Sequence, residues 1–154
     1  MNRLDLTNDH MLRETFGHTV PIPPEMKLKV SQAILTVAGA DGEVSPREME
    51  YFLGLARSMG CTDAILEQLL KFDYRAAKLP DFYDAQTKPV GRHILYDAIH
   101  VARQDGFGPK EREAAFRAAK MLGLDPHLVV DIEGLLGIED AVRAARIRLL
   151  SPVE

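Results

Sequence analysis

The sequence predicts an all-α fold made of two helical units in a pseudo-twofold arrangement, and three observations indicate it. Alternating apolar and polar residues never persist long enough to form a convincing strand. Proline and glycine residues mark helix starts and ends along the chain. A long pattern of helices and turns also occurs twice. Because 46% of the 154 residues are hydrophobic and 27% are charged, we expect one packed domain spanning residues 1–154.

Eight helical segments are expected, each bounded by residues that start or stop helices. They cover, in order, about residues 3–16, 25–40, 46–60, 63–72, 89–104, 109–123, 125–137 and 138–150. The first is weak and ends before the prolines of HTVPIPPE. The second presents apolar side chains on one side, as a core helix does: Val30, Ala33, Ile34, Val37 and Ala38.

The third segment has the clearest start. The stretch SPRE, which begins at Ser45, is a capping box with proline at the first helical position. Gly60 ends this helix, and Thr62 or Asp63 caps the fourth. The stretch YRAAKLPDFYDAQTKP, at residues 74–89, is then expected to be a linker between the halves of the chain.

The second half is punctuated in the same way. Pro89 and Pro109 open the fifth and sixth helices, and Gly123 closes the sixth. Asp125 and the proline after it start the seventh, which is expected to end near Gly137. The eighth carries three arginines, for which a solvated face is expected: Arg143, Arg146 and Arg148.

An internal repeat relates residues of about 28–72 to residues of about 90–136. Four pairs of residues mark it: Asp41 and Asp105, Gly42 and Gly106, Glu48 and Glu111, Gly60 and Gly123. The second copy is one residue shorter between its Asp-Gly and its next helix. Each unit can bury against the other an apolar face that it cannot bury alone. Helical geometry directs both aspartates toward this interface, where carboxylates without partners are costly.

Composition and charge exclude several classes of function. The formal net charge of -4 gives no reason to expect nucleic-acid binding. The sequence has no bilayer-length apolar run, and its start, MNRLDLTNDHMLRE, has no signal-peptide core. The single cysteine, Cys61, excludes an internal disulfide and a multi-cysteine zinc site. These features predict a cytoplasmic protein without a membrane span.

The two turns resemble those of the tellurite-resistance TerB-like family. The stretches that carry the resemblance are AGADGEVSPRE in the first unit and VARQDGFGPKERE followed by KMLGLDP in the second, within residues 28–136. The resemblance implies a TerB-like helical bundle and a role in stress response, often tied to tellurite resistance, with no established catalysis. It also implies a divalent-metal site at Asp41, Glu48, Asp105 and Glu111. The shortened second loop is a departure that shifts Glu111 relative to Asp105.

The same four acids have a simpler interpretation as helix caps and turn acceptors. Glu48 is the third helical residue of a capping box, and an aspartate can bond backbone amides within its own turn. If they do bind a metal, oxygen ligands of this kind suit Ca²⁺, Mg²⁺ or Mn²⁺. A working EF-hand is disfavoured, because its first and third loop positions would be Val37 and Gly39, which carry no carboxylate.

Structural roles are expected for two other groups of candidate functional residues. His93, Asp97 and His100 lie at helical spacing opposite an apolar face, so a solvated polar face is expected rather than a metal site. Cys61 follows a helix-ending glycine and is expected to be a small core residue rather than a nucleophile.

Three functional hypotheses remain from the sequence. The first is a non-enzymatic TerB-like protein that binds a divalent cation and acts in stress response through protein partners of unknown identity. The alternative is a structural protein-interaction module whose acidic residues only cap helices. An enzyme has the least support, since no nucleophile with a base and no acid/base pair is recognisable. Clustered acids at the turns favour the first hypothesis, and an exposed apolar groove favours the second.

Overall fold

The computed structural model describes residues 3–20 and 22–152, and this part of the chain forms helices and turns without a β-strand. The α-helices are α1 (Arg3–Phe16), α2 (Lys27–Ala38), α3 (Pro46–Ser58), α4 (Asp63–Leu70), α5 (Gly91–Ala102), α6 (Pro109–Met121) and α7 (His127–Leu150). Short 3₁₀ turns at Pro24–Met26, Leu79–Asp81 and Lys88–Val90 join them. The predicted all-α class is therefore confirmed.

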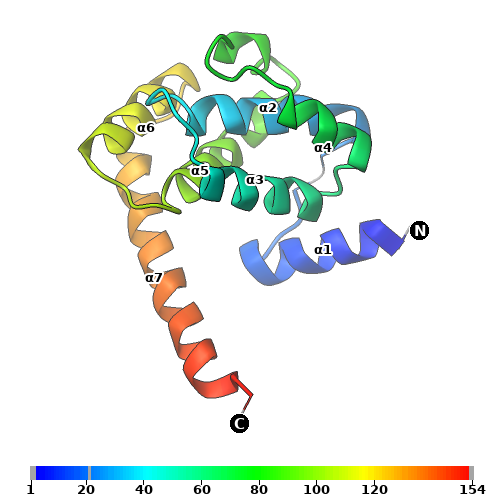
Figure 1. The fold of residues 1–154 in the computed structure, drawn as a ribbon, viewed down its shortest axis with the longest axis vertical. Helices are drawn as coiled ribbons and strands as arrows, with labels where there is room; N and C mark the ends of the chain where they lie inside the picture. The colour runs from blue at the N-terminus through cyan, green and yellow to red at the C-terminus, as the bar shows by residue number, and fades with distance from the viewer. Residues whose placement is uncertain (1–2, 21, 153–154) are drawn as a thin grey trace.

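The core is organised around α5, which packs against α2, α3, α6 and α7 (Figure 1). Ile94, Leu95 and Ile99 of α5 are fully buried, and α2 buries Ile34 and Leu35 against the same core. The contact between α2 and α5 joins the first helices of the two sequence repeats. Each repeat thus buries its apolar face against the other, as the sequence predicts.

The break expected near Gly137 is absent, because α7 runs without interruption from His127 to Leu150. Gly137 does not adopt the positive φ with which Gly60 (φ 84°) follows the end of α3. A glycine in a helix interior costs about 1 kcal/mol relative to alanine, which does not suffice to end a helix without that conformation. The last two predicted segments are therefore one helix, held to the core at its start by Val129, Ile132 and Leu136.

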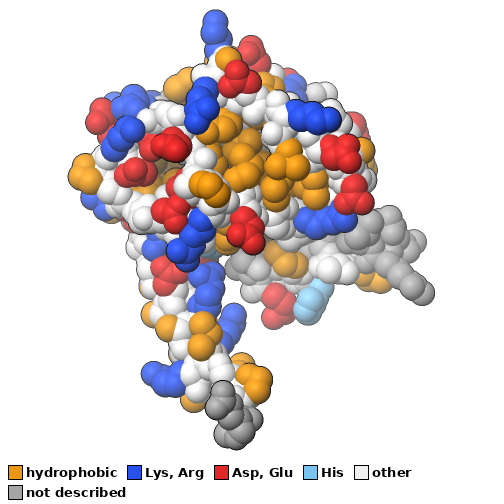
Figure 2. Space-filling model, viewed as in Figure 1, with side chains coloured by type: hydrophobic (Ala, Val, Ile, Leu, Met, Phe, Trp, Pro, Cys, Tyr) orange, Lys and Arg blue, Asp and Glu red, His pale blue; other side chains and the backbone are white. Residues whose placement is uncertain are grey.

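The C-terminal half of α7 extends away from the other helices, and α1 lies on the same side of the molecule, below α3 (Figure 1). Along this part of α7 exposed hydrophobic side chains alternate with basic ones, and a hydrophobic patch lies at the centre of the visible face of the body with acidic and basic side chains around it (Figure 2). The exposed apolar residues of α7 include Leu135, Ile138, Val142, Ile147, Leu149 and Leu150. Within the described residues, no helix combines the length and apolarity that crossing a bilayer requires.

Candidate functional site

The first Asp-Gly turn follows the end of α2. Asp41 Oδ1 accepts a hydrogen bond of 3.2 Å from the backbone N–H of Glu43. Gly42 adopts φ 111°, a conformation that side chains disfavour. The turn is fixed from outside by Arg75, whose Nε donates to the carbonyl oxygen of Gly42 at 3.1 Å. This turn geometry explains how an aspartate is tolerated just past a helix C-terminus, where the helix dipole disfavours negative charge.

The second turn repeats the first at the end of α5. Gly106 adopts φ 113°, close to the value of Gly42, so the Asp-Gly pairs of the two units share one backbone geometry. Asp105 is exposed to solvent, whereas Asp41 is partly buried. The expectation that both aspartates face the interface away from water is therefore met by Asp41, whereas Asp105 contacts Ser45 of the other unit but stays exposed to solvent.

Each turn leads to a helix capped by its own glutamate. Ser45 Oγ accepts from the N–H of Glu48 at 3.1 Å, and Glu48 Oε2 accepts from the N–H of Ser45 at 2.8 Å. In the second unit Glu111 Oε2 accepts from the N–H of Gly108 at 2.9 Å. The shorter second loop thus leaves Glu111 at the third helical position, as in the first unit, and only the serine hydroxyl is missing.

Acidic side chains of each unit lie at the interface with the other unit. Ser45 Oγ, at the cap of Glu48, donates a hydrogen bond to Asp105 Oδ2 of the other unit. Asp41 in turn lines a void of about 10 Å³ together with Glu111, between α2, α5 and α6. Asp105 therefore lies at the helix cap of the first unit. Asp41 lies beside a void that Glu111, the capping glutamate of the second unit, also lines. This crossed arrangement follows from packing α2 against α5.

Negative charge accumulates around Glu48. Burial raises the pKa of its carboxyl group above the usual range, and the charges of Asp105 and Asp41 raise it further, while hydrogen bonds from Ser45 act in the opposite direction. Asp105 is paired with Arg47, whose Nε lies 3.9 Å from Asp105 Oδ1 on an exposed side chain. A surface pair of this kind compensates little of the repulsion.

The four acids fit a divalent cation in donor chemistry but do not form a complete cage. In the described part of the chain, no three His, Cys, Asp or Glu side chains are grouped closely enough to hold a metal ion. The described hydrogen bonds do, however, use a single carboxylate oxygen of each acid. The second oxygen of Asp105 lies 3.9 Å from Arg47 Nε, and the second oxygens of the other three acids accept none of these bonds. Carboxylate oxygens are the ligands that hard divalent cations prefer.

The polar residues of α5 are not the solvated face that their spacing indicates. Asp97 is only 6% exposed, and burial lowers the pKa of both His93 and His100. Phe16 of α1 covers His93 with its ring centroid 5.0 Å away, and Tyr51 of α3 hydrogen-bonds the ring of His100 at 3.1 Å. The expectation was wrong because α1 and α3 cover this side of α5.

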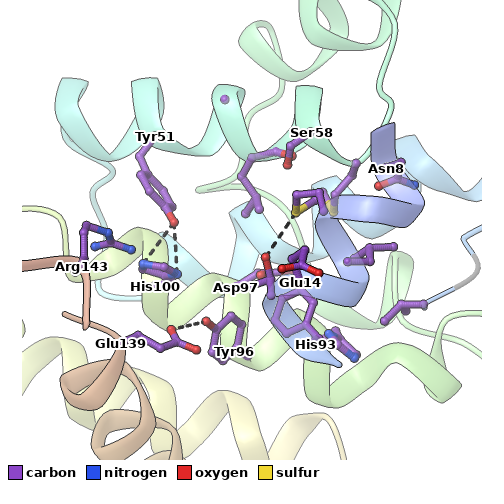
Figure 3. Close-up of a pocket in the computed structure, with 18 of the residues that line it drawn as sticks. Asn8, Glu14, Tyr51, Ser58, His93, Tyr96, Asp97, His100, Glu139 and Arg143 are labelled. Atoms are coloured by element: carbon purple, nitrogen blue, oxygen red, sulfur yellow. Dashed lines mark hydrogen bonds between the residues drawn. The ribbon is translucent and has the colours of Figure 1, made fainter. Parts of the chain in front are cut away.

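These residues line a cavity of about 810 Å³ between α1, α3, α5 and α7 (Figure 3). Sequence reasoning missed it, although one signal was available. Besides the polar stripe, α5 carries apolar residues in almost every direction, and a helix that is apolar nearly all round is buried. Cys61, in contrast, behaves as predicted: it is 2% exposed in the core, where burial raises the pKa of its thiol.

Together the paired turns and the two helical units form a helical bundle with a TerB-like fold. The chain is similar to a tellurite resistance protein from Nostoc punctiforme PCC 73102, known from its crystal structure, with a TM-score of 0.88 and 29% sequence identity. The similarity covers 100% of this chain and 98% of that one. No family model and no curated protein matches the sequence significantly. The resemblance to the TerB-like family is thus confirmed over the full length of the chain.

Replacing Ser45 by alanine is expected to lower the free energy of unfolding by about 1–2 kcal/mol, because it removes the cap of α3 and the hydrogen bond to Asp105. Thr62→Ala is the matched control: Thr62 caps α4 through a longer bond of 3.4 Å to the N–H of Ile65. Urea unfolding should therefore show a larger loss for Ser45→Ala. Equal losses would contradict a stabilising bond between the units.

Proposed function

We propose that this chain is a non-catalytic, cytoplasmic TerB-like protein of the tellurite-resistance type that binds a divalent cation between its two Asp-Gly turns. The observation that carries the proposal is the crossed pairing of acids. Asp105 bonds the cap residue of Glu48, and Asp41 shares a void with Glu111. Each pair combines one acid from each unit, so a bound cation would hold the two units together. The likeness to a tellurite resistance protein supports the same assignment.

The pairing favours a hydrated cation. Mg²⁺ commonly takes one or two carboxylates from a protein and keeps several waters, whereas Ca²⁺ takes six to eight oxygen ligands. Two carboxylates are supplied by each pair, which is Asp105 with Glu48 in one case and Asp41 with Glu111 in the other. Mn²⁺ shares the preference for oxygen ligands. Mg²⁺ and Mn²⁺ are therefore expected to bind more tightly than Ca²⁺.

Thermal unfolding with added cations tests this function. Mg²⁺ or Mn²⁺ should raise the melting temperature relative to chelator, because the unfolded chain lacks the site; a concentration of a hundred times Kd adds about 2.7 kcal/mol. The double variant Asp41→Asn with Asp105→Asn should lose this response. It should also be more stable than the parent in chelator, because it removes repulsion around Glu48.

A second double variant controls for general charge. Asp81→Asn with Asp131→Asn removes the same charge from two exposed positions away from the turns, and it should respond to cations as the parent does. Equal melting temperatures of the parent with chelator and with each cation would contradict the proposal.

The alternative is that the acids act only as caps, within a structural interaction module. It is favoured by the hydrogen bonds that all four acids already accept from backbone or hydroxyl donors. On this alternative the Asp41 and Asp105 variant is modestly less stable at every metal concentration.

Both proposals include binding to protein partners. The exposed apolar row on the C-terminal half of α7 supports them, because apolar patches of this kind mark interaction surfaces.

A further inference from the structure

The cavity between α1, α3, α5 and α7 has the properties of a small-molecule site. Its volume of about 810 Å³ lies within the usual range for ligand pockets, roughly 300–1,000 Å³. Its walls are mainly apolar, and they include Met11 and Leu12 of α1, Leu55 of α3 and Met59 just after α3. A cavity of this kind selects its ligand through the few polar groups that converge on it.

Two of those polar groups are hydrogen-bond acceptors without a donor. Asp97 is 6% exposed and lines the cavity from α5, and no group in residues 6–20 and 22–152 donates a hydrogen bond to its carboxylate. Asn8 lines the cavity from α1, and its buried Oδ1 has no donor in that part of the chain either. Burial alone raises the pKa of Asp97, to about 7. Because a buried acceptor without a partner is costly, Asn8 Oδ1 and the Asp97 carboxylate favour a ligand that brings hydrogen-bond donors.

The positions of the other charged groups indicate which part of the cavity would hold the polar group of such a ligand. In Figure 3 Asp97 lies near the centre of the view, whereas Arg143 lies at its left, beyond Tyr51 and His100. Arg143 is also engaged by Asp140, with Nη1 and Oδ1 3.3 Å apart. The titratable and charged groups that face the cavity from the packed helices are Glu14, Tyr51, His93, Tyr96, His100, Glu139, Arg143 and Arg146.

Aromatic rings also line the cavity. Phe16 and Tyr96 meet edge to face with centroids 5.4 Å apart, and Tyr96 lies 5.8 Å from the ring of His100 in the same manner. Aromatic faces attract cations, and a buried carboxylate adds a full opposite charge.

We infer that this cavity binds an organic ammonium compound with an apolar body, whose N–H donors bond Asp97. The apolar body fills the space between α1 and α3, and the ammonium group supplies the donors that the carboxylate lacks. The inference does not depend on the divalent-cation site around the Asp-Gly turns, because none of its four acids lines this cavity.

Calorimetric titration with three probes of one shape tests the inference. The probes are 4-phenylbenzylammonium, the neutral alcohol 4-phenylbenzyl alcohol and the anion 4-biphenylacetate, each titrated at pH 8 in chelator. The full chain should bind the ammonium at least about tenfold more tightly than the alcohol, as a charge-assisted hydrogen bond predicts. The anion should bind most weakly. The chelator removes divalent cations, so failure of this test leaves the cation proposal untouched.

Asp97→Asn should weaken ammonium binding by about tenfold and leave the affinity for the alcohol nearly unchanged. Asp81→Asn, the same change at an exposed position, should alter neither affinity. The inference is wrong if the three probes bind equally, if none binds, if the anion binds most tightly or if ammonium binding survives in the folded Asp97→Asn protein. A melting curve of that variant establishes that it folds.

Discussion

Val37→Asp is expected to lower the free energy of unfolding by roughly 3–5 kcal/mol, because it places an unpaired charge in the interface between α2 and α5. Val37 is 6% exposed and packs in the core cluster. The new carboxylate would also lie near Asp41, which shares a small void with Val37. Like charges brought close together repel, which adds to the loss.

The same substitution at an exposed valine separates burial from charge. Val130 is 45% exposed on α7, so Val130→Asp should change stability by less than about 1 kcal/mol. Urea unfolding of both variants gives the comparison directly. Similar stabilities for the two would mean that the face of α2 around Val37 is solvated and that the packing of the units is wrong.

Asp97→Asn is expected to stabilise the protein increasingly as pH rises. The pKa of Asp97 is about 7 in the folded protein against an ordinary value of 3.8, so between these values the folded state binds more protons than the unfolded state. Stability must then fall with rising pH over that window, and the loss is complete above pH 7. Asparagine carries no charge and avoids the loss. The advantage of the variant should grow by roughly 2–3 kcal/mol between pH 5 and pH 8.

Urea unfolding of both proteins at pH 5 and pH 8 measures this difference. Because the histidines near the cavity titrate in both proteins, their contributions cancel in the comparison. A constant difference between parent and variant at the two pH values would show that Asp97 is solvated or paired in the folded protein.

Local sequence signals predicted most of the fold. The capping box at Ser45 is present as expected, and the glycines of the two turns share a conformation that few other residues adopt. These features depend on neighbours in the chain, so their physics is visible in the sequence. The prediction of a helix end near Gly137 was wrong because a glycine stops a helix only where the backbone can adopt a positive φ. That conformation depends on the residues after the glycine and on packing.

The sequence named the members of the candidate site but not their arrangement, and their role as metal ligands stays a prediction. The repeat identified Asp41, Glu48, Asp105 and Glu111, yet the crossing of acids between the units arises from the packing of α2 on α5, which no local pattern encodes. The cavity was missed for a related reason. A polar stripe on a helix looks solvated until another segment covers it, and here α1, a weak helix in the sequence, lies over α5.

Paramagnetic broadening by Mn²⁺ tests the central claim, a cation site shared by the two turns, most directly. A small fraction of an equivalent of Mn²⁺, added to the ¹⁵N-labelled protein, should broaden the amide signals of Gly42 and Gly106 together with their neighbours in both turns. The signals around Asp125 and Asp131, exposed carboxylates of the same chain, should remain sharp, and excess Mg²⁺ should restore the broadened ones. Broadening spread evenly over all exposed acids, or absent from one of the two turns, would contradict the claim.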